Sequence, residues 1–554
     1  MPALVLAVLA LAVLILTRSM QQTGDALLYA TSIKTGEDLF HPHHLAYAPV
    51  VRAIYLALRP LGASGWDAIA AAQFHGIAWA TVAVVFVFRT ARRITGWTSL
   101  ALAGALGLLF TQGFWMVSTH ANSYVPALGC LSCALYFLVR GRPASPSRGE
   151  LVAFSVLWGM AILYHQVNVL LVLPLLLFLG TAGGSSRRGI APALLPASGM
   201  VAAAYAAAAL AEPGSATADL VRFPLDYALH PNPNWGTLRH LSPSGLGELI
   251  SGPAWAVFAL HRTFGGLVVT VVTVLVAAVV VWHFRQALLG ARDAPLRVLL
   301  GSWVVAYLGF YLWWLPSHKP LYVLTSLPIL LLVLLAFDDQ AAASRYFGIG
   351  PTASAAIPAV AVAVMAGFNL VAVILPLHSS KRPAYDEARS LHEQVDPGCY
   401  MLTSYEVAQS LRYYFDRPRS AHARFPLLCI FQDVPIPEEF EIRDGECVVI
   451  EAAYLRPDGD LYGFDAYSHP ARFERFLEWL LGVPPGGGSS HRAIGSIEAL
   501  GGKGYVTLGT VRETHDGWDS LLVDLDRAAP WHDRALETWW ESTRAGEERP
   551  DEAQ

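Results

Sequence analysis

The chain has 554 residues, of which 54% are hydrophobic and only 15% are charged, with a mean hydropathy of +0.42. Apolar runs that match a bilayer core of ~30 Å, at about 20 residues per helix, recur along the first 377 residues and predict a polytopic α-helical membrane protein. The net charge of −5, without a long basic block or a zinc-type cysteine spacing, argues against a nucleic-acid partner.

The charge pattern sets the number and direction of the expected crossings. Arginines flank the apolar run 151–180 on both sides, and the positive-inside rule puts both flanks in the cytoplasm, so this run must cross twice. The resulting odd number of crossings places the N-terminus inside and the C-terminal part outside. The eleven expected helices span 3–17, 68–88, 98–115, 122–139, 150–164, 167–182, 190–211, 264–283, 298–315, 320–337 and 353–376.

The first outer loop is expected to carry a helix of its own. Residues 47–58 place apolar side chains at helical spacing with arginines on another face, which predicts an amphipathic helix in the outer interface.

The chain is expected to divide into a transmembrane domain, residues 1–377, and an extracytoplasmic α/β domain, residues 378–554. The second domain is predicted from alternating elements, with strands at 399–404 and 447–452, helices at 406–415 and 471–481, and a flexible loop at 484–490. Its cysteines, Cys399, Cys429 and Cys447, allow one disulfide.

Asp25 lies nine residues past the end of the first apolar segment at Leu16. If the helix continues, this spacing raises the carboxylate ~13 Å, to about the height of a lipid phosphate. Asp25 then acts as a general base, or caps a short helix beginning at Ala26, or does both. Tyr29, four residues on, would share its face and bond the carboxylate or the acceptor.

Two other groups in the first expected outer loop could carry chemistry. Glu37 and Asp38 form an acidic pair that is either solvated surface, a metal ligand set or a second catalytic carboxylate. The histidines His41, His43 and His44 could bind a lipid phosphate or sugar by hydrogen bonds, pack in the interface or bind a metal; Pro42 and the lack of a nearby cysteine argue against a metal.

Two outer turns add further candidates. His165 and Gln166 stand in a tight turn between short helices, where they either serve a substrate or satisfy backbone groups at the helix ends. Lys319, next to His318, runs against the positive-inside trend; it either neutralises a phosphate leaving group or extends from the flank of a helix into the interface.

Together, Gly24-Asp25-Ala26-Leu27-Leu28-Tyr29-Ala30, Phe40-His41-Pro42-His43-His44 and Tyr164-His165-Gln166 resemble the GT-C class of polytopic glycosyltransferases. The nearest resemblance is to the protein O-mannosyltransferases and to bacterial aminoarabinose- and mannose-transferring relatives, over roughly residues 1 to 377. It implies an inverting transfer from a polyprenyl-phosphate sugar on the outer face, with Asp25 as the first-loop catalytic acid. Many members carry adjacent acidic residues there, whereas Asp25 stands alone, so Glu37 or Asp38 could assist.

The sequence is therefore interpreted as a multi-pass glycosyltransferase of a bacterial inner membrane. Lys319, with His318 or with His43 and His44, would hold the donor phosphate, and the C-terminal domain would meet a protein, lipid or glycan acceptor. No cofactor is expected, and a divalent metal is left open. The alternatives are a transporter or flippase for a lipid-linked sugar, or a non-catalytic scaffold that displays the C-terminal domain. Coupled transporters usually need charges inside the membrane, whereas the expected spans hold few ionisable residues beyond histidines such as His75.

Overall fold

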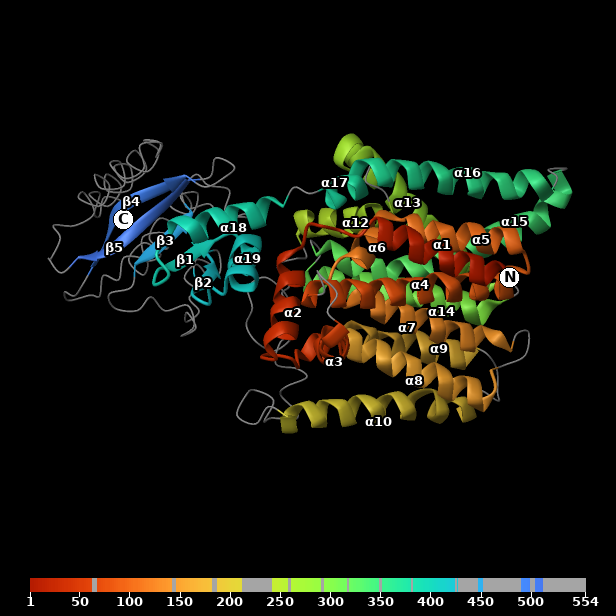
Figure 1. Cartoon of the computed structure of the whole chain (residues 1–554). Helices are drawn as coiled ribbons and strands as arrows, with labels where there is room; N and C mark the ends of the chain where they lie inside the picture. The colour runs from red at the N-terminus through yellow and green to blue at the C-terminus, as the bar shows by residue number, and fades with distance from the viewer. Residues whose placement is uncertain are drawn as a thin grey trace, which may run out of the picture. The chain divides into compact units, whose positions relative to one another are not determined.

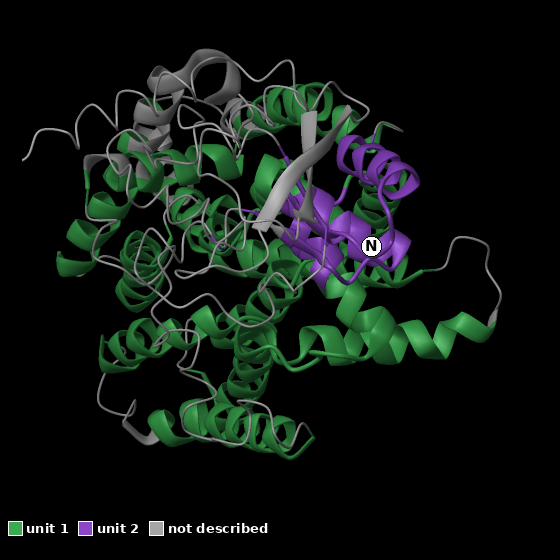
Figure 2. Cartoon of the chain, turned by 90° about the vertical axis from the view of Figure 1, so that its left-hand side faces the viewer, with its two compact units in different colours: residues 1–21, 29–380 green, residues 22–28, 381–554 purple. Residues whose placement is uncertain are grey.

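The computed structural model describes residues 1–61, 67–141, 146–181, 187–211, 242–257, 261–289, 293–315, 318–347, 351–379, 382–423, 426, 447–451, 490–498 and 504–511. The chain divides into two compact units (Figure 2). The first unit comprises Met1–Gln21 and Tyr29–Ser380, and the second comprises Gln22–Leu28 and Lys381–Gln554. The short segment around Asp25 thus groups with the C-terminal part of the chain.

The first unit is built from helices that pack side by side (Figure 1). Helix α4 packs against α1, α5 and α7, and α8 packs against α7 and α10. The α-helices that begin before residue 240 are α1 (Pro2–Leu16), α2 (Gly24–Thr35), α3 (Tyr47–Leu58), α4 (Ala68–Thr95), α5 (Thr98–Phe110), α6 (Gln112–Thr119), α7 (Tyr124–Arg140), α8 (Arg148–Tyr164), α9 (Val172–Thr181) and α10 (Arg187–Ala211). Those that follow are α12 (Pro243–Val257), α13 (His261–Leu288), α14 (Ala294–Trp314), α15 (Val323–Phe347), α16 (Pro351–Asn369) and α17 (Leu375–His378).

Several described helices are long and apolar enough to cross a membrane. Five pass by length and composition, namely Ala68–Thr95, Gly189–Ala211, Ala294–Trp314, Lys319–Ala336 and Pro358–Gln394. Helices α5 and α6, bent by 58° at Thr111, add a sixth if they form one broken span. Every expected crossing coincides with a helix, so the helical membrane architecture is supported. The count of eleven stays a prediction.

Local sequence explains where the helices differ from expectation. Helix α4 begins after Asp67, whose carboxylate accepts from the Ala70 amide at 2.7 Å, and continues past the expected end at 88 to Thr95. It ends at Gly96, which adopts a left-handed φ of 74° that favours glycine. Helix α12 lies between the expected crossings 190–211 and 264–283, where no helix is expected, whereas the expected helix at 47–58 is confirmed as α3.

The second unit contains a mixed sheet with strand order β2-β1-β3-β5-β4. The strands are β1 (Tyr400–Thr403), β2 (Ser420–His422), β3 (Val448–Glu451), β4 (Ser490–Glu498) and β5 (Gly504–Val511). Strand β1 pairs in parallel with β2 and β3, and β5 pairs antiparallel with β3 and β4. The expected strands at 399–404 and 447–452 are therefore present as β1 and β3.

Two helices and a disulfide complete the described part of this unit. Helices α18 (Pro383–Gln394) and α19 (Tyr405–Phe415) pack on the sheet through a core that includes Leu391, Leu411 and Val449. Cys399 and Cys447, next to β1 and β3, form a disulfide. The expected helix at 471–481, and the expected loop at 484–490 apart from Ser490 at the start of β4, lie outside the described residues.

Candidate functional site

Asp25 lies in the first turn of α2 with its side chain half-buried. The helix begins at Gly24, and the Thr23 hydroxyl accepts a hydrogen bond from the Ala26 amide at 3.2 Å. Thr23 therefore supplies the cap, and the alternative in which Asp25 caps a helix beginning at Ala26 is wrong. The carboxylate of Asp25 is left for another role.

A tyrosine of the same unit binds this carboxylate. The hydroxyl of Tyr405, the first residue of α19, donates to Oδ1 of Asp25 at 3.0 Å. Gly24 makes room for this contact, because a Cβ built there would overlap the Tyr405 ring. Among the described residues, Oδ2 of Asp25 has no hydrogen-bond partner.

The histidines between α2 and α3 come together with a histidine from another turn. The His41 imidazole accepts from the His43 amide at 3.3 Å and so starts the short 3-10 helix Pro42–His44. The His44 ring stacks on His41 with centroids 5.4 Å apart and lies 4.7 Å from the ring of His165. Tyr29 meets His44 edge-on at 5.5 Å. The structure thus brings together the rings of four residues: Tyr29, His41, His44 and His165.

His165 is held by the break between α8 and the 3-10 helix Gln166–Leu171. Its backbone is extended, with φ −158° and ψ 112°. The side-chain nitrogen Nδ2 of Asn168 donates to the carbonyl oxygens of Ala161 and His165 at 2.9 and 2.8 Å. The Tyr307 hydroxyl of α14 donates to Oδ1 of Asn168 at 2.8 Å. The His165 ring itself accepts from the Val167 amide through Nδ1 at 3.3 Å and so caps the 3-10 helix, which confirms the backbone role expected for His165. The same ring also lies beside the other histidines.

The same cluster extends to His318. The Tyr124 ring lies 4.6 Å from that of His165, and its hydroxyl is hydrogen-bonded to His318 Nε2 at 2.7 Å. Ser123 is hydrogen-bonded to His44 Nδ1 at 3.0 Å. We call His41, His43, His44, His165 and His318 the histidine cluster. Gln166, next to His165, is only partly buried in the following 3-10 helix.

Burial sets the charge state of the cluster. Burial first, and then neighbouring His41, lowers the pKa of His43 to about 3. Burial and the surrounding histidines also hold the pKa values of His44 and His165 well below the usual 6.5. These imidazoles are therefore neutral at pH 7, each able to donate one hydrogen bond and accept one. Neutral imidazoles are better suited to bind hydroxyl groups than to neutralise the negative charge of a phosphate.

Lys319 places a positive charge in the first unit. It begins the 3-10 helix Lys319–Tyr322, which the Tyr311 hydroxyl fixes by donating to the Leu321 carbonyl at 2.8 Å. The ammonium group forms an ion pair with Glu248 of α12 and donates to Ser251 at 2.6 Å. The side chains of Lys319 and Glu248 are 23% and 47% exposed.

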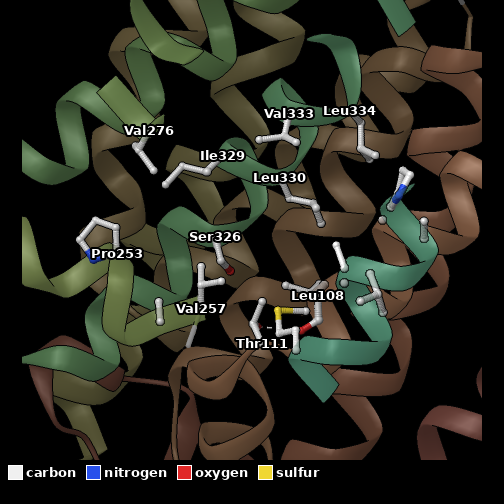
Figure 3. A pocket seen from close by; sticks show the side chains of 18 of the residues that line it. Leu108, Thr111, Pro253, Val257, Val276, Ser326, Ile329, Leu330, Val333 and Leu334 are labelled. Atoms are coloured by element: carbon white, nitrogen blue, oxygen red, sulfur yellow. Dashed lines mark hydrogen bonds between the residues drawn. The ribbon is translucent and has the colours of Figure 1, made fainter. Parts of the chain in front are cut away.

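An apolar cavity of about 310 Å³ lies in the first unit, with walls from α5, α12, α13, α15 and α16 (Figure 3). Its lining includes Leu108, Pro253, Val257 and Leu330, and Tyr322 also contributes to it. Two of the elements around this cavity, α12 and the 3-10 helix Lys319–Tyr322, are the elements that hold the Lys319 ion pair. The apolar cavity and the ammonium group of Lys319 are therefore formed in part by the same two elements.

The remaining acidic candidates stand apart. Glu37 and Asp38 are both exposed in the turn after α2, where Asp38 has a left-handed φ of 48°. In the described part of the chain, no three His, Cys, Asp or Glu side chains are arranged to hold a metal ion.

Sequence reasoning missed Tyr405 and Glu248 as partners of predicted site residues. Each lies at least 70 residues from its partner, and neither belongs to a spaced motif.

The comparisons with known proteins agree with this fold. The family model for dolichyl-phosphate-mannose-protein mannosyltransferases matches residues 45–210. No curated protein sequence matches the chain. Among solved structures, ArnT from Cupriavidus metallidurans bound to undecaprenyl phosphate is 15% identical, with 91% of this chain and 97% of that chain covered and a TM-score of 0.53.

A second solved structure also matches the chain. Archaeal oligosaccharyltransferase AglB from Archaeoglobus fulgidus, in complex with an inhibitory peptide and a dolichol-phosphate, is 13% identical, with 93% and 75% covered and a TM-score of 0.50. The expected resemblance to the GT-C class and to the mannosyltransferase family is therefore confirmed, and the chain has the fold of these membrane glycosyltransferases.

Proposed function

We propose that the chain transfers a sugar from a polyprenyl-phosphate donor to an acceptor on the outer face of a bacterial inner membrane, with Asp25 as the general base. The observation that carries this proposal is the state of Asp25. Because Thr23 caps the helix, the carboxylate of Asp25 is not needed as a cap. Tyr405 binds its Oδ1, and no described residue binds its Oδ2, which can therefore meet a substrate. A half-buried carboxylate with one open oxygen is suited to accept a proton.

The donor site is assigned to Lys319 and the neighbouring apolar cavity. A 3-10 helix has about three residues per turn, so Lys319 and Tyr322 lie on the same edge of their helix. Lys319 would meet the phosphate, while Tyr322 and Pro253 line the volume that would receive the apolar tail. The lipid phosphates bound to ArnT and AglB support this class of donor.

The reaction balances with these groups. The acceptor oxygen attacks the anomeric carbon of the sugar, its proton goes to Oδ2 of Asp25, and the bond between that carbon and the phosphate oxygen breaks. Polyprenyl phosphate leaves with the bonding electron pair, and Lys319 stabilises its charge. Attack opposite the leaving group inverts the anomeric centre.

The histidine cluster and the C-terminal unit have separate roles in this proposal. Neutral imidazoles of His43, His44 and His165, together with Tyr29, Gln166 and His318, would bind sugar hydroxyls. The C-terminal unit would meet a protein, lipid or glycan acceptor. The inhibitory peptide bound to AglB supports a protein among these classes.

The decisive experiment replaces Asp25 and measures release of polyprenyl phosphate by mass spectrometry. Asp25→Asn keeps the size of the side chain, and general-base catalysis contributes about 10²–10⁴-fold, so transfer should fall by that factor. Thr23→Ala is the matched control: it removes the helix cap, at a cost of about 0.5–2 kcal/mol, and leaves the carboxylate in place. It should lower thermal stability and retain transfer.

The reverse result would reject the proposal. If Asp25→Asn transfers sugar at the wild-type rate, Asp25 is not the base. If no donor sugar is transferred by the wild type while labelled lipid-linked sugar changes leaflet, the chain is a flippase.

A further inference from the structure

The first residue of α19 follows an inner strand of the sheet in the second unit. Tyr405 follows β1, which is hydrogen-bonded on both sides, to β2 and to β3. Two turns of α19 are anchored by Val407 and Leu411, both buried in the core with Met401 of β1. The Tyr405 ring thus projects from a fixed strand-to-helix junction.

The Tyr405 ring packs against the start of helix α2. Its first residue is Gly24, where any side chain would overlap the Tyr405 ring. The next residue, Asp25, accepts the Tyr405 hydroxyl at 3.0 Å. A ring packed against the backbone and a hydrogen bond to the adjacent side chain together fix both the distance and the direction of the contact.

This contact restricts the carboxylate. A hydrogen bond to Oδ1 selects one rotamer of Asp25 and leaves Oδ2 as the proton acceptor. A hydroxyl that donates to an ionised oxygen forms a charge-assisted bond, which is stronger than a neutral one. Misplacement of a reacting group by about 1 Å costs up to about 10²-fold in rate.

We propose that Tyr405 is a positioning residue for Asp25, so that the C-terminal unit orients the base of the transfer reaction. The inference rests on the proposed function, in which Asp25 accepts the acceptor proton. Through Tyr405, the second unit then affects the chemical step by orienting Asp25, in addition to any acceptor contact.

Kinetics of the full-length protein test this. Tyr405→Phe removes one oxygen and keeps the ring against Gly24. We expect kcat to fall about 10- to 100-fold with the KM values for donor and acceptor unchanged. Tyr414→Phe removes a hydroxyl from the same helix and should leave kcat unchanged.

A second variant should lower kcat while leaving Tyr405 in place. Gly24→Ala introduces a methyl group that must push the ring away, so kcat should also fall although the hydroxyl remains. This variant decides the question if Tyr405→Phe fails to fold.

Double variants separate this inference from the proposed function. In an Asp25→Asn background, Tyr405→Phe should cause no further loss, because the oriented group is gone. An equal loss in both backgrounds, or a rise in KM with kcat unchanged, would overturn the role of Tyr405. Full transfer by Asp25→Asn alone would instead reject Asp25 as the base.

Discussion

Lys319 illustrates how a residue can be paired and still be available to a ligand. Its partner Glu248 is about half exposed, and exposed ion pairs contribute only about 0–1 kcal/mol. A charge-assisted contact with a donor phosphate is worth roughly 1.5–3 kcal/mol, so the phosphate should displace Glu248 from the ammonium group. The ion pair then holds Lys319 in position in the free enzyme at little cost to donor binding.

Opposite substitutions in this pair should change donor affinity in opposite directions. Lys319→Ala should raise the donor KM about ten- to hundredfold, whereas Glu248→Gln, which removes the competing carboxylate, should lower it by several-fold. Lys319→Arg should retain part of the affinity. These values are measured by varying the donor at saturating acceptor, with thermal unfolding as the control. An unchanged donor KM for Lys319→Ala would make this residue an interfacial anchor.

At the scale of elements, the helices could be predicted from the sequence but their partners could not. Apolar runs and terminal residues locate α3, α19 and the start of α4 closely, because these signals are local. Contacts such as those of Tyr405 with Asp25, and of Glu248 with Lys319, depend on packing between segments far apart in sequence. A single turn can also mislead: Thr23 and Asp25 are both good capping residues, and only the geometry shows that Thr23 is used.

The histidine cluster, whose members lie in or next to three 3-10 helices, should make stability depend on pH. The folded pKa of His43 is about 3, whereas an unfolded histidine takes up a proton below about 6.5. The unfolded chain then binds more protons than the folded chain between these values. Stability is therefore complete above pH 6.5 and is lost as the pH falls toward 3, by up to about 1.4 kcal/mol per pH unit for each such histidine.

Thermal unfolding in detergent between pH 8 and pH 4.5 measures this effect. The melting temperature should fall below pH 6.5, and His43→Gln, which cannot take up the proton, should flatten the dependence. An identical slope in wild type and His43→Gln would show that His43 does not contribute. Gln is chosen because it keeps a polar side chain of similar reach.

At the scale of the whole molecule, chain topology decides whether Asp25 and the C-terminal unit meet the outer face. Arginines concentrate in the turns assigned to the cytoplasm: Arg92 and Arg93 stand in the last turn of α4, and Arg140 in the last turn of α7. The Cys399–Cys447 disulfide in the C-terminal unit independently favours an oxidising compartment, because disulfides persist outside the cytoplasm. Two unrelated properties of the chain therefore favour the same sidedness.

Reporter fusions test this topology directly. Alkaline phosphatase fused after Ser380 should be active, because that enzyme folds outside the cytoplasm, and a protein that fluoresces only in the cytoplasm should be dark at the same point. Fusions after Arg142, in a turn assigned to the inside, should give the opposite pair of results. The positive-inside bias predicts both outcomes from the arginine positions alone. Inactive phosphatase and bright fluorescence after Ser380 would place the C-terminal unit inside, and with it the carboxylate of Asp25 that this unit holds.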